Sequence, residues 1–410
     1  MRSVCFVKHF EIDFSGVVYR NAVTLGDVNN DGDDELIFGN MDGELSIYKG
    51  TEPVQTIQNL GLITAIGIGD IMNCGSNALV VVSGDGWCHI FLCLNCDLNI
   101  SDEFSSSKLE CVHSQRVPPN TKALILGDVD NDGNVELVVG LTDRVVRSYR
   151  WVQNAASGKL VCLNKWECAN QIGSITLNYN SEGLPCLLIS QPGGTFMRIR
   201  SKTCSDCDLD GSEEEITTME VDYHPLYSSQ MRNPCISSEI VGNLKTNFSP
   251  DAKKGGTRYA VATLDGSLML VQDEKVVWSL QVDHQLFALG KLDVAGDGQD
   301  EIIASSWDGQ TYILDQNKKT VCFNIEESIS GFCAGLYSLG PNVAPVPCFI
   351  YTTFSNKVLV YHDINLPNLV TKSFFSKCEE DADLKEMAEK LDKKSLANLI
   401  SKCLYNRRQP

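Results

Sequence analysis

Short apolar runs alternate with polar turns along most of the chain. One unit begins with Val23–Leu25, crosses a polar loop to Glu35–Gly39, turns at Asp42-Gly43 and ends in the alternating run Glu44–Tyr48. Asp-Gly between two strand-like runs indicates a β-hairpin, because glycine accepts the positive φ of the favoured turns. The unit is therefore predicted to be an antiparallel sheet.

The same scheme of runs and turns repeats along the chain. Helical periodicity is absent inside the copies, and a period of about 43 to 50 residues is typical of a β-propeller blade. A single sheet of this kind leaves the apolar side chains of both its faces exposed to solvent, whereas seven sheets arranged radially bury one another's faces. The units are 23–48, 65–92, 123–149, 174–199, 240–271, 288–314 and 334–361.

These repeats predict an all-β fold, a seven-bladed β-propeller with FG-GAP-like repeats over residues 1–375. The N-terminal run Val4–Phe14 has no unit of its own, so we expect it to complete the last blade and close the ring. Residues 201–235 form an acidic insertion. From residue 376 to 410 apolar residues recur at three- and four-residue steps, which predicts a short C-terminal helical tail. Packing on the rim and partner binding are both open for this tail.

Charge and hydropathy exclude several partner classes. The chain has 410 residues, 43% of them hydrophobic, and a net charge of -19. Nucleic-acid binding depends on Lys and Arg that neutralise phosphates, and no basic cluster is present. No apolar run reaches the roughly 18 residues of a membrane-spanning helix. We expect no nucleic-acid partner and no direct membrane insertion.

Cysteine usage favours a reducing compartment. The chain has 17 cysteines, an odd number, and several of them stand in apolar runs where a free thiol behaves as a small hydrophobe. The N-terminus lacks the unbroken apolar run of a secretion signal. The cysteines are interpreted as reduced thiols of a cytoplasmic protein.

Two polar loops, in the first and third units, carry oxygen-bearing side chains at alternate positions with glycine at the turn. A hard cation such as calcium takes six to eight oxygen ligands in this kind of loop. Alternatively, Asp and Asn simply bond their own turn backbone. Both interpretations stay open, with structural calcium as the only candidate cofactor and none required. The candidate ligands are Asp27, Asn29, Asp31 and Glu35 in the first loop, and Asp128, Asp130, Asp132 and Glu136 in the third.

Other acidic loops depart from the full pattern. The sixth unit has Ala295 where a ligand would stand, and the second keeps only Asp70 among the carboxylates, so both are expected to be metal-free. Asp206–Glu214 also has the spacing, but it lies in the insertion with no apolar strand leading into it. We interpret it as a solvated acidic loop.

Motifs of catalysis are missing from the sequence. None of the six histidines is accompanied by a nucleophile motif, and no GxSxG, HExxH or P-loop pattern occurs. The chain is predicted not to be an enzyme.

The Asp-rich loops resemble the FG-GAP repeats of integrin α-subunit propellers, in which a calcium ion sits in a β-hairpin loop of the blade. In that family the ninth loop position is usually Asp, whereas Glu35 and Glu136 stand there in this chain. The side chains are one methylene longer than the family pattern has.

Longer stretches resemble a narrower family, the FG-GAP repeat-containing subunits of the KICSTOR complex. They are Leu280–Leu289, Lys291–Val294, Trp307–Ile313 and Thr142–Arg147. The resemblance implies a non-catalytic scaffold that recruits GATOR to lysosomes and restrains TOR kinase signalling when amino acids or glucose run short. It implies a kaptin-like propeller subunit and other KICSTOR subunits as partners, with GATOR reached through the complex. The expected location is cytoplasmic, peripheral at the lysosomal membrane through partners.

Two alternatives to the scaffold remain. An extracellular, integrin-like calcium-dependent binding propeller is favoured by the Asp-rich loops, and it would carry glycans at the sequons of Asn99 and Asn247. A propeller enzyme would need clustered His, Arg and carboxylate groups at the mouth of the central channel, and no such pattern is visible in the sequence.

Overall fold

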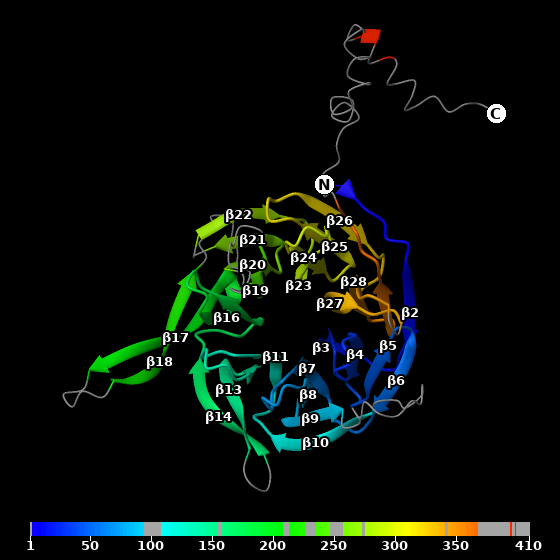
Figure 1. Ribbon diagram of the computed structural model, residues 1–410. Helices are drawn as coiled ribbons and strands as arrows, with labels where there is room; N and C mark the ends of the chain where they lie inside the picture. Colours follow the sequence, from blue (N-terminus) through cyan, green and yellow to red (C-terminus); the bar gives the residue numbers. More distant parts are fainter. Residues whose placement is uncertain are drawn as a thin grey trace. The chain divides into compact units, whose positions relative to one another are not determined.

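Seven antiparallel sheets are arranged radially about a central axis in the computed structural model (Figure 1). The structure describes residues 2–93, 108–153, 158–207, 213–225, 235–246, 257–272, 275–340 and 343–367, with 394, 395 and 398. Two compact units are distinguished, Met1–Pro367 and Asn368–Pro410, and the first contains all seven sheets. The prediction of an all-β, seven-bladed propeller is confirmed.

Each blade is a four-stranded meander that starts at the axis and ends at the rim. In blade 1 the order is β3 (Val18–Gly26), β4 (Glu35–Asn40), β5 (Leu45–Lys49) and β6 (Glu52–Ile57). Blade 2 comprises β7 (Ile63–Gly69), β8 (Ala78–Ser83), β9 (Trp87–Cys93) and β10 (Leu109–Arg116), and blade 3 comprises β11 (Thr121–Gly127), β12 (Glu136–Leu141), β13 (Val145–Gln153) and β14 (Gly158–Glu167).

The remaining blades follow the same order. Blade 4 comprises β15 (Ile175–Tyr179), β16 (Pro185–Gln191), the 3-10 turn η1 (Pro192–Gly194), β17 (Thr195–Cys207) and β18 (Glu213–Pro225). Blade 5 comprises β19 (Ser238–Leu244), β20 (Arg258–Thr263), β21 (Ser267–Gln272) and β22 (Lys275–Gln281). Blade 6 comprises β23 (Leu286–Leu292), β24 (Glu301–Ser306), β25 (Gln310–Leu314) and β26 (Thr320–Asn324), and blade 7 comprises β27 (Ile329–Tyr337), β28 (Val346–Thr353) and β29 (Lys357–Tyr361).

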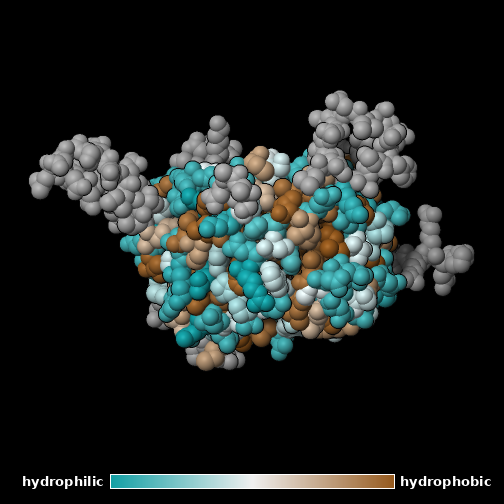
Figure 2. Space-filling model, turned by 90° about the horizontal axis from the view of Figure 1, so that it is seen from below, coloured by the Kyte–Doolittle hydropathy of each residue, from teal (hydrophilic) through white to brown (hydrophobic). Residues whose placement is uncertain are grey.

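The seven sequence units correspond to the first three strands of each blade. The fourth strand lies between units in blades 1 to 6 and comes from the N-terminus in blade 7. It lies at the rim, where hydrophilic and hydrophobic residues are mixed (Figure 2), and its apolar pattern is weaker. For example, β6 has only exposed and half-buried residues, whereas every residue of β4 is buried. A strand buried on both faces between neighbouring blades is the one that an apolar run marks most clearly.

The ring is closed by the N-terminal strand β2 (His9–Asp13), as predicted. It pairs antiparallel with β29, with Phe10 opposite Val360 and Ile12 opposite Val358. A short strand, β1 (Arg2–Ser3), comes before it and pairs parallel with β26 of blade 6. This second pairing has no signal in the apolar pattern of the sequence, and it attaches the N-terminal segment to two blades.

Two paired strands extend into the acidic insertion. The interpretation of Asp206–Glu214 as a solvated loop was therefore wrong at its two ends, where β17 ends at Cys207 and β18 begins at Glu213. The pairing of β17 with β18 runs from Thr195–Pro225 outward to Cys207–Glu213. In Figure 1 this ribbon projects beyond the rim of the ring. Its polar residues can form strands because backbone hydrogen bonds between them need no buried face. Residues 208–212 lie outside the described residues.

The helical tail predicted over 376–410 also lies outside the described residues, apart from 394, 395 and 398. Among the described residues, no helix combines the length and the hydropathy that crossing a membrane requires.

Neighbouring blades approach closely at two glycines of the second strands. A Cβ added at Gly39 would lie 2.7 Å from Ile63 of blade 2, and one at Gly140 would lie 2.6 Å from Ile175 of blade 4. Neither glycine has a positive φ. Glycine is therefore required at these positions by the side chain of the next blade, and not by backbone conformation.

Substitution of Gly39 by valine is expected to lower the free energy of unfolding by about 2 kcal/mol, because the new side chain overpacks the contact with Ile63. Chemical denaturation monitored by circular dichroism measures the change. Gly340→Ala is the control, since a Cβ there would meet only Val343 at an ordinary 3.7 Å. Equal stability of the two variants would contradict the proposed reason for glycine.

Candidate functional site: the aspartate-rich loops

The candidate loop of blade 1 joins β3 to β4 and is closed by its own polar groups. Asp27 accepts hydrogen bonds from the backbone N–H of Asp31 at 3.1 Å and of Gly32 at 2.9 Å. The Asn29 amide donates to Asp31 at 2.9 Å and to Glu35 at 3.1 Å. All four predicted ligands of this loop thus take part in one hydrogen-bond network. Both carboxylate oxygens of Asp27 are used by backbone N–H groups of the turn.

The first aspartate makes the same turn in four blades. In each, its carboxylate accepts the N–H groups of the residues four and five positions later, and the latter residue is a glycine with positive φ. The second loop has this geometry although it lacks the other carboxylates, so the turn does not depend on a metal-ligand set. The acceptors and donors are Asp27 with Asp31 and Gly32, Asp70 with Cys74 and Gly75, Asp128 with Asp132 and Gly133, and Asp293 with Asp297 and Gly298.

The glutamate at the ninth loop position is buried and holds the start of the loop. Glu35, Glu136 and Glu301 are at most 2% exposed. One carboxylate oxygen of each accepts a backbone N–H of the loop, from Val28 at 3.1 Å in blade 1 and Val129 at 2.9 Å in blade 3. The extra methylene relative to aspartate gives the carboxylate the reach for this bond.

A lysine lies among the carboxylates of the first loop. Lys49, the last residue of β5, forms ion pairs with Asp31, with Asp33 at 3.0 Å and with Glu35 at 3.6 Å. Its side chain is 20% exposed and that of Glu35 is 2% exposed. The ammonium group of Lys49 therefore supplies positive charge at the place predicted for a calcium ion.

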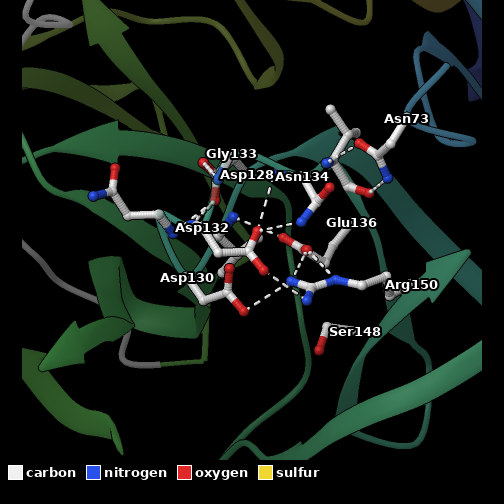
Figure 3. A network of polar contacts seen from close by, with 12 residues as sticks. Asn73, Asp128, Asp130, Asp132, Gly133, Asn134, Glu136, Ser148 and Arg150 are labelled. Atoms are coloured by element: carbon white, nitrogen blue, oxygen red, sulfur yellow. Dashed lines mark hydrogen bonds and ion pairs between the residues drawn. The ribbon is translucent and has the colours of Figure 1, made fainter. Parts of the chain in front are cut away.

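An arginine has the same place in the third loop. Figure 3 shows the Arg150 guanidinium pointing among Asp130, Asp132 and Glu136. It contacts Asp130 at 2.9 Å, Asp132 at 2.7 Å and Glu136 through two donors, of which Nε lies at 2.9 Å. Charge-assisted contacts of this kind are among the strong hydrogen bonds of proteins. A cation from the same blade therefore offsets part of the negative charge of this loop.

A calcium ion fits these residues poorly while Arg150 holds its position. One oxygen each from Asp128, Asp130 and Glu136 lies within 4.8 Å of the others, which is a spacing that a cation could bridge. However, Arg150 contacts two of these three groups, and Asp128 accepts three backbone N–H groups. Calcium needs six to eight oxygen ligands with available lone pairs.

Sequence reasoning missed Lys49 and Arg150 because they lie 14 positions after the glutamates, on another strand. Pairing of Leu36 with Tyr48, and of Leu137 with Tyr149, brings each basic residue beside its glutamate. The Asp-Gly turn centres the first of these hairpins, so counting outward from that turn would have placed Lys49 beside Glu35. The signal was present in the hairpin register and not in the loop motif.

The sixth loop has a carboxylate where the first and third loops have a basic side chain. Asp315 has the position of Lys49 and Arg150, and it accepts the N–H groups of Asn317 and Lys319. Glu301 keeps its bonds from Val294 at 2.8 Å and Ala295 at 3.2 Å. Burial raises the pKa of Glu301 to about 7, with smaller contributions from Asp293 and Asp297.

This raised pKa predicts a pH dependence of stability. The folded chain binds the Glu301 proton more tightly than the unfolded chain, whose pKa is near 4.5. The bound proton's contribution to stability is complete below pH 4.5 and is lost as the pH rises through 7, by roughly 3 kcal/mol at about 1.4 kcal/mol per pKa unit. Glu301→Gln should remove this part of the decline in denaturation experiments between pH 5 and pH 8. An unchanged slope in the variant would contradict the assignment.

Three polar side chains of the central channel, those of Arg20, Asn21 and Lys122, bond to other protein groups. Arg20 of β3 forms a two-point ion pair with Glu239 of β19, with N–O distances of 2.7 and 2.8 Å. Lys122 of β11 donates to the carbonyl of Ile172 at 2.6 Å, and burial lowers the pKa of its ammonium group. Asn21 donates to the carbonyl of Lys122. These contacts link different blades of the ring to one another.

Comparisons with known proteins agree over most of the chain. A family model described as Integrin-alpha FG-GAP repeat-containing protein 2 matches residues 47–366. The KICSTOR complex protein ITFG2 of Mus musculus is 37% identical over 441 residues, which cover 100% of this chain and 97% of the relative. The Bos taurus protein of the same name is 36% identical over 402 residues, covering 90% of this chain and 73% of the relative.

Solved structures with a similar fold are more distant in sequence. Two crystal structures of BBS1N in complex with ARL6DN, soaked with mercury and with lead, have a TM-score of 0.58. They are 16% and 14% identical and cover 89% and 90% of this chain and 100% of their own. At this identity the likeness shows the fold alone.

Proposed function

Because this chain belongs to the Integrin-alpha FG-GAP repeat-containing protein 2 family, we propose that it is a non-catalytic scaffold subunit of a KICSTOR complex. The observation that carries the proposal is the 37% identity with the mouse KICSTOR complex protein over the full length of this chain. A propeller suits this role because its blades offer broad outer surfaces to partners while its own core stays closed.

The proposal includes specific partners and a location. The chain would bind a kaptin-like propeller subunit and other KICSTOR subunits, and through the complex it would recruit GATOR to lysosomes. There it would restrain TOR kinase signalling during amino-acid or glucose shortage. Attachment to the lysosomal membrane would be peripheral and would depend on these partners.

The absence of catalysis is part of the proposal. The pairing of Arg20 with Glu239 and of Lys122 with Ile172 supports it, since a general acid or base must be able to reach a substrate. Within the described residues, the charged groups of the channel named above bond to the protein itself.

We also propose that Lys49 and Arg150 replace calcium in the first and third loops. Their contacts with Asp31, Asp33 and Glu35, and with Asp130, Asp132 and Glu136, support this assignment. The chain would then need no cofactor, and its loops would hold their shape at the low calcium concentration of the cytosol.

Affinity purification of the tagged full-length chain from cells, followed by mass spectrometry, tests the scaffold role. We expect a kaptin-like subunit and GATOR components to be recovered, and a lysosomal fraction to contain the chain under amino-acid shortage. A tagged propeller of unrelated family is the control. Recovery of the chain alone, or secretion with glycans on Asn99 and Asn247, would favour the extracellular alternative; both asparagines lie outside the described residues.

A further inference from the structure

Three aromatic rings are stacked across blades 6 and 7. Phe287 of β23 is buried and packs flat against Trp307, with ring centroids 4.0 Å apart and an interplanar angle of 16°. Phe354 continues the stack at 6.2 Å and 26°. Trp307 and Phe354 both lie in the turn that follows the second strand of their blades, β24 and β28. The stack is thus held by two adjacent turns on rigid strands.

The outer part of this stack faces solvent. Trp307 is 38% exposed and Phe354 is 54% exposed, whereas Phe287 is 3% exposed. Large aromatic side chains at a surface are typical of the central contacts of protein interfaces. The buried Phe287 fixes the tryptophan ring, so the exposed rings are ordered before any partner arrives.

Carboxylates flank the exposed rings. Asp308 follows Trp307, lies 2.7 Å from Nδ1 of His284 and has a side chain that is 59% exposed. Glu327 accepts a hydrogen bond at 2.9 Å from the hydroxyl of Ser355, the residue after Phe354. Lys357, a nearby cation, is paired with Glu11 at 2.7 Å. With a net charge of -19 on the whole chain, this surface complements a basic partner.

The chain itself shows how such a ring is covered by a cation. Trp87, beside the corresponding turn of blade 2, is 37% exposed, and the Arg116 guanidinium lies 5.1 Å from its ring centroid. Among the described residues no Lys or Arg has this position over Trp307 or Phe354. Cation–π contact is favourable for arginine on exposed aromatic rings.

We propose that Trp307, Phe354, Asp308 and Glu327 form a docking surface for an arginine-containing segment of a protein partner. The segment would lay a guanidinium or an aliphatic side chain against the aromatic stack and place further basic groups near the two carboxylates. This inference rests on the proposed scaffold function, for which it supplies a contact surface and the chemistry of the partner.

Binding of a fluorescein-labelled peptide of alternating arginine and leucine to the full-length chain tests the surface by fluorescence anisotropy. Phe354→Ser is expected to weaken binding roughly tenfold, because both the ring face and its apolar area are lost. Glu327→Gln should weaken it by about threefold and reduce its salt dependence. Trp87→Ala is the matched control and should leave the affinity unchanged, since Arg116 already covers that ring.

Equal affinity of the wild type, Phe354→Ser and Glu327→Gln would overturn the inference, and so would equal binding of a glutamate–leucine peptide. Affinity purification of the wild type and of Phe354→Ser from cells shows whether a failure concerns the docking surface or the scaffold role. If the wild type recovers KICSTOR subunits and the variant recovers the same set while binding the peptide normally, the surface is wrong and the scaffold role stands. If the wild type recovers none, the scaffold role fails, and the peptide result still decides the surface.

Discussion

Replacement of Arg150 by methionine is expected to lower the free energy of unfolding by about 3 to 5 kcal/mol, because it leaves three carboxylates without their cation. Glu136, with a side chain that is 2% exposed, would be the most affected of the three. Burial already raises its pKa, and the guanidinium opposes that rise. Chemical denaturation of the full-length variant measures the loss.

Calcium should partly restore this variant. Without Arg150, the oxygens of Asp128, Asp130 and Glu136 within 4.8 Å of one another become available to a cation. We expect millimolar calcium to raise the melting temperature of Arg150→Met and to have little effect on the wild type, since only a ligand that binds the folded state stabilises it. Titration calorimetry gives the corresponding affinities.

Arg147→Met on the same strand is the matched control for Arg150. Its guanidinium contacts the sulfur of Cys162 at 3.9 Å and lies outside the acidic loop. We expect a small stability change and no gain of calcium binding in this control. If the wild type bound calcium as tightly as Arg150→Met, the guanidinium would not be replacing an ion, and the calcium interpretation of the loops would be restored.

Breaking the ion pair between Arg20 and Glu239 is expected to cost about 3 kcal/mol, whichever partner is removed. The pair joins the inner strands of blades 1 and 5, which are not neighbours in the ring. Arg20 also donates to the carbonyl of Phe287 on blade 6. Loss of one partner leaves a charge in a site where the Glu239 side chain is 8% exposed.

Arg20→Met combined with Glu239→Leu should be less destabilised than the sum of the two single variants, since neither charge is then left alone. Differential scanning calorimetry of the four proteins measures the coupling. Lys8→Met is the control, because its pair with Asp363 lies on the surface and is screened by solvent. Additive effects of Arg20→Met and Glu239→Leu would show that the pair does not tie the blades together.

The Asp-rich loops were predicted only in part from the sequence. The spacing of Asp27, Asn29 and Asp31 correctly indicated a tight turn rich in oxygen acceptors, which is a local property of neighbouring residues. It could not show that the charge is balanced by Lys49, because that contact depends on the register of two strands. The loop motif was recognised because its residues are neighbours in the sequence. The lysine that enters the loop comes from another strand of the sheet.

The insertion gives a second example. A sequence pattern detects a strand by the apolar face that it buries, and the part of β17 and β18 beyond the ring has few apolar residues. Their pairing from Thr195–Pro225 to Cys207–Glu213 continues a hairpin that starts inside blade 4. Backbone hydrogen bonds extend these strands although they lack the apolar face by which a strand is recognised in a sequence.

The alternation of apolar runs and turns was enough to predict the number of blades, the all-β class and the strand that closes the ring. These features are local, because the burial pattern of a strand repeats every two residues along the sequence. Tertiary structure alone decided which cation fills the acidic loops, which glycines meet the next blade and which aromatic rings stack at the surface. Those features depend on distances between residues far apart in the chain, such as Phe287 and Phe354, and these distances exist only once the ring has closed.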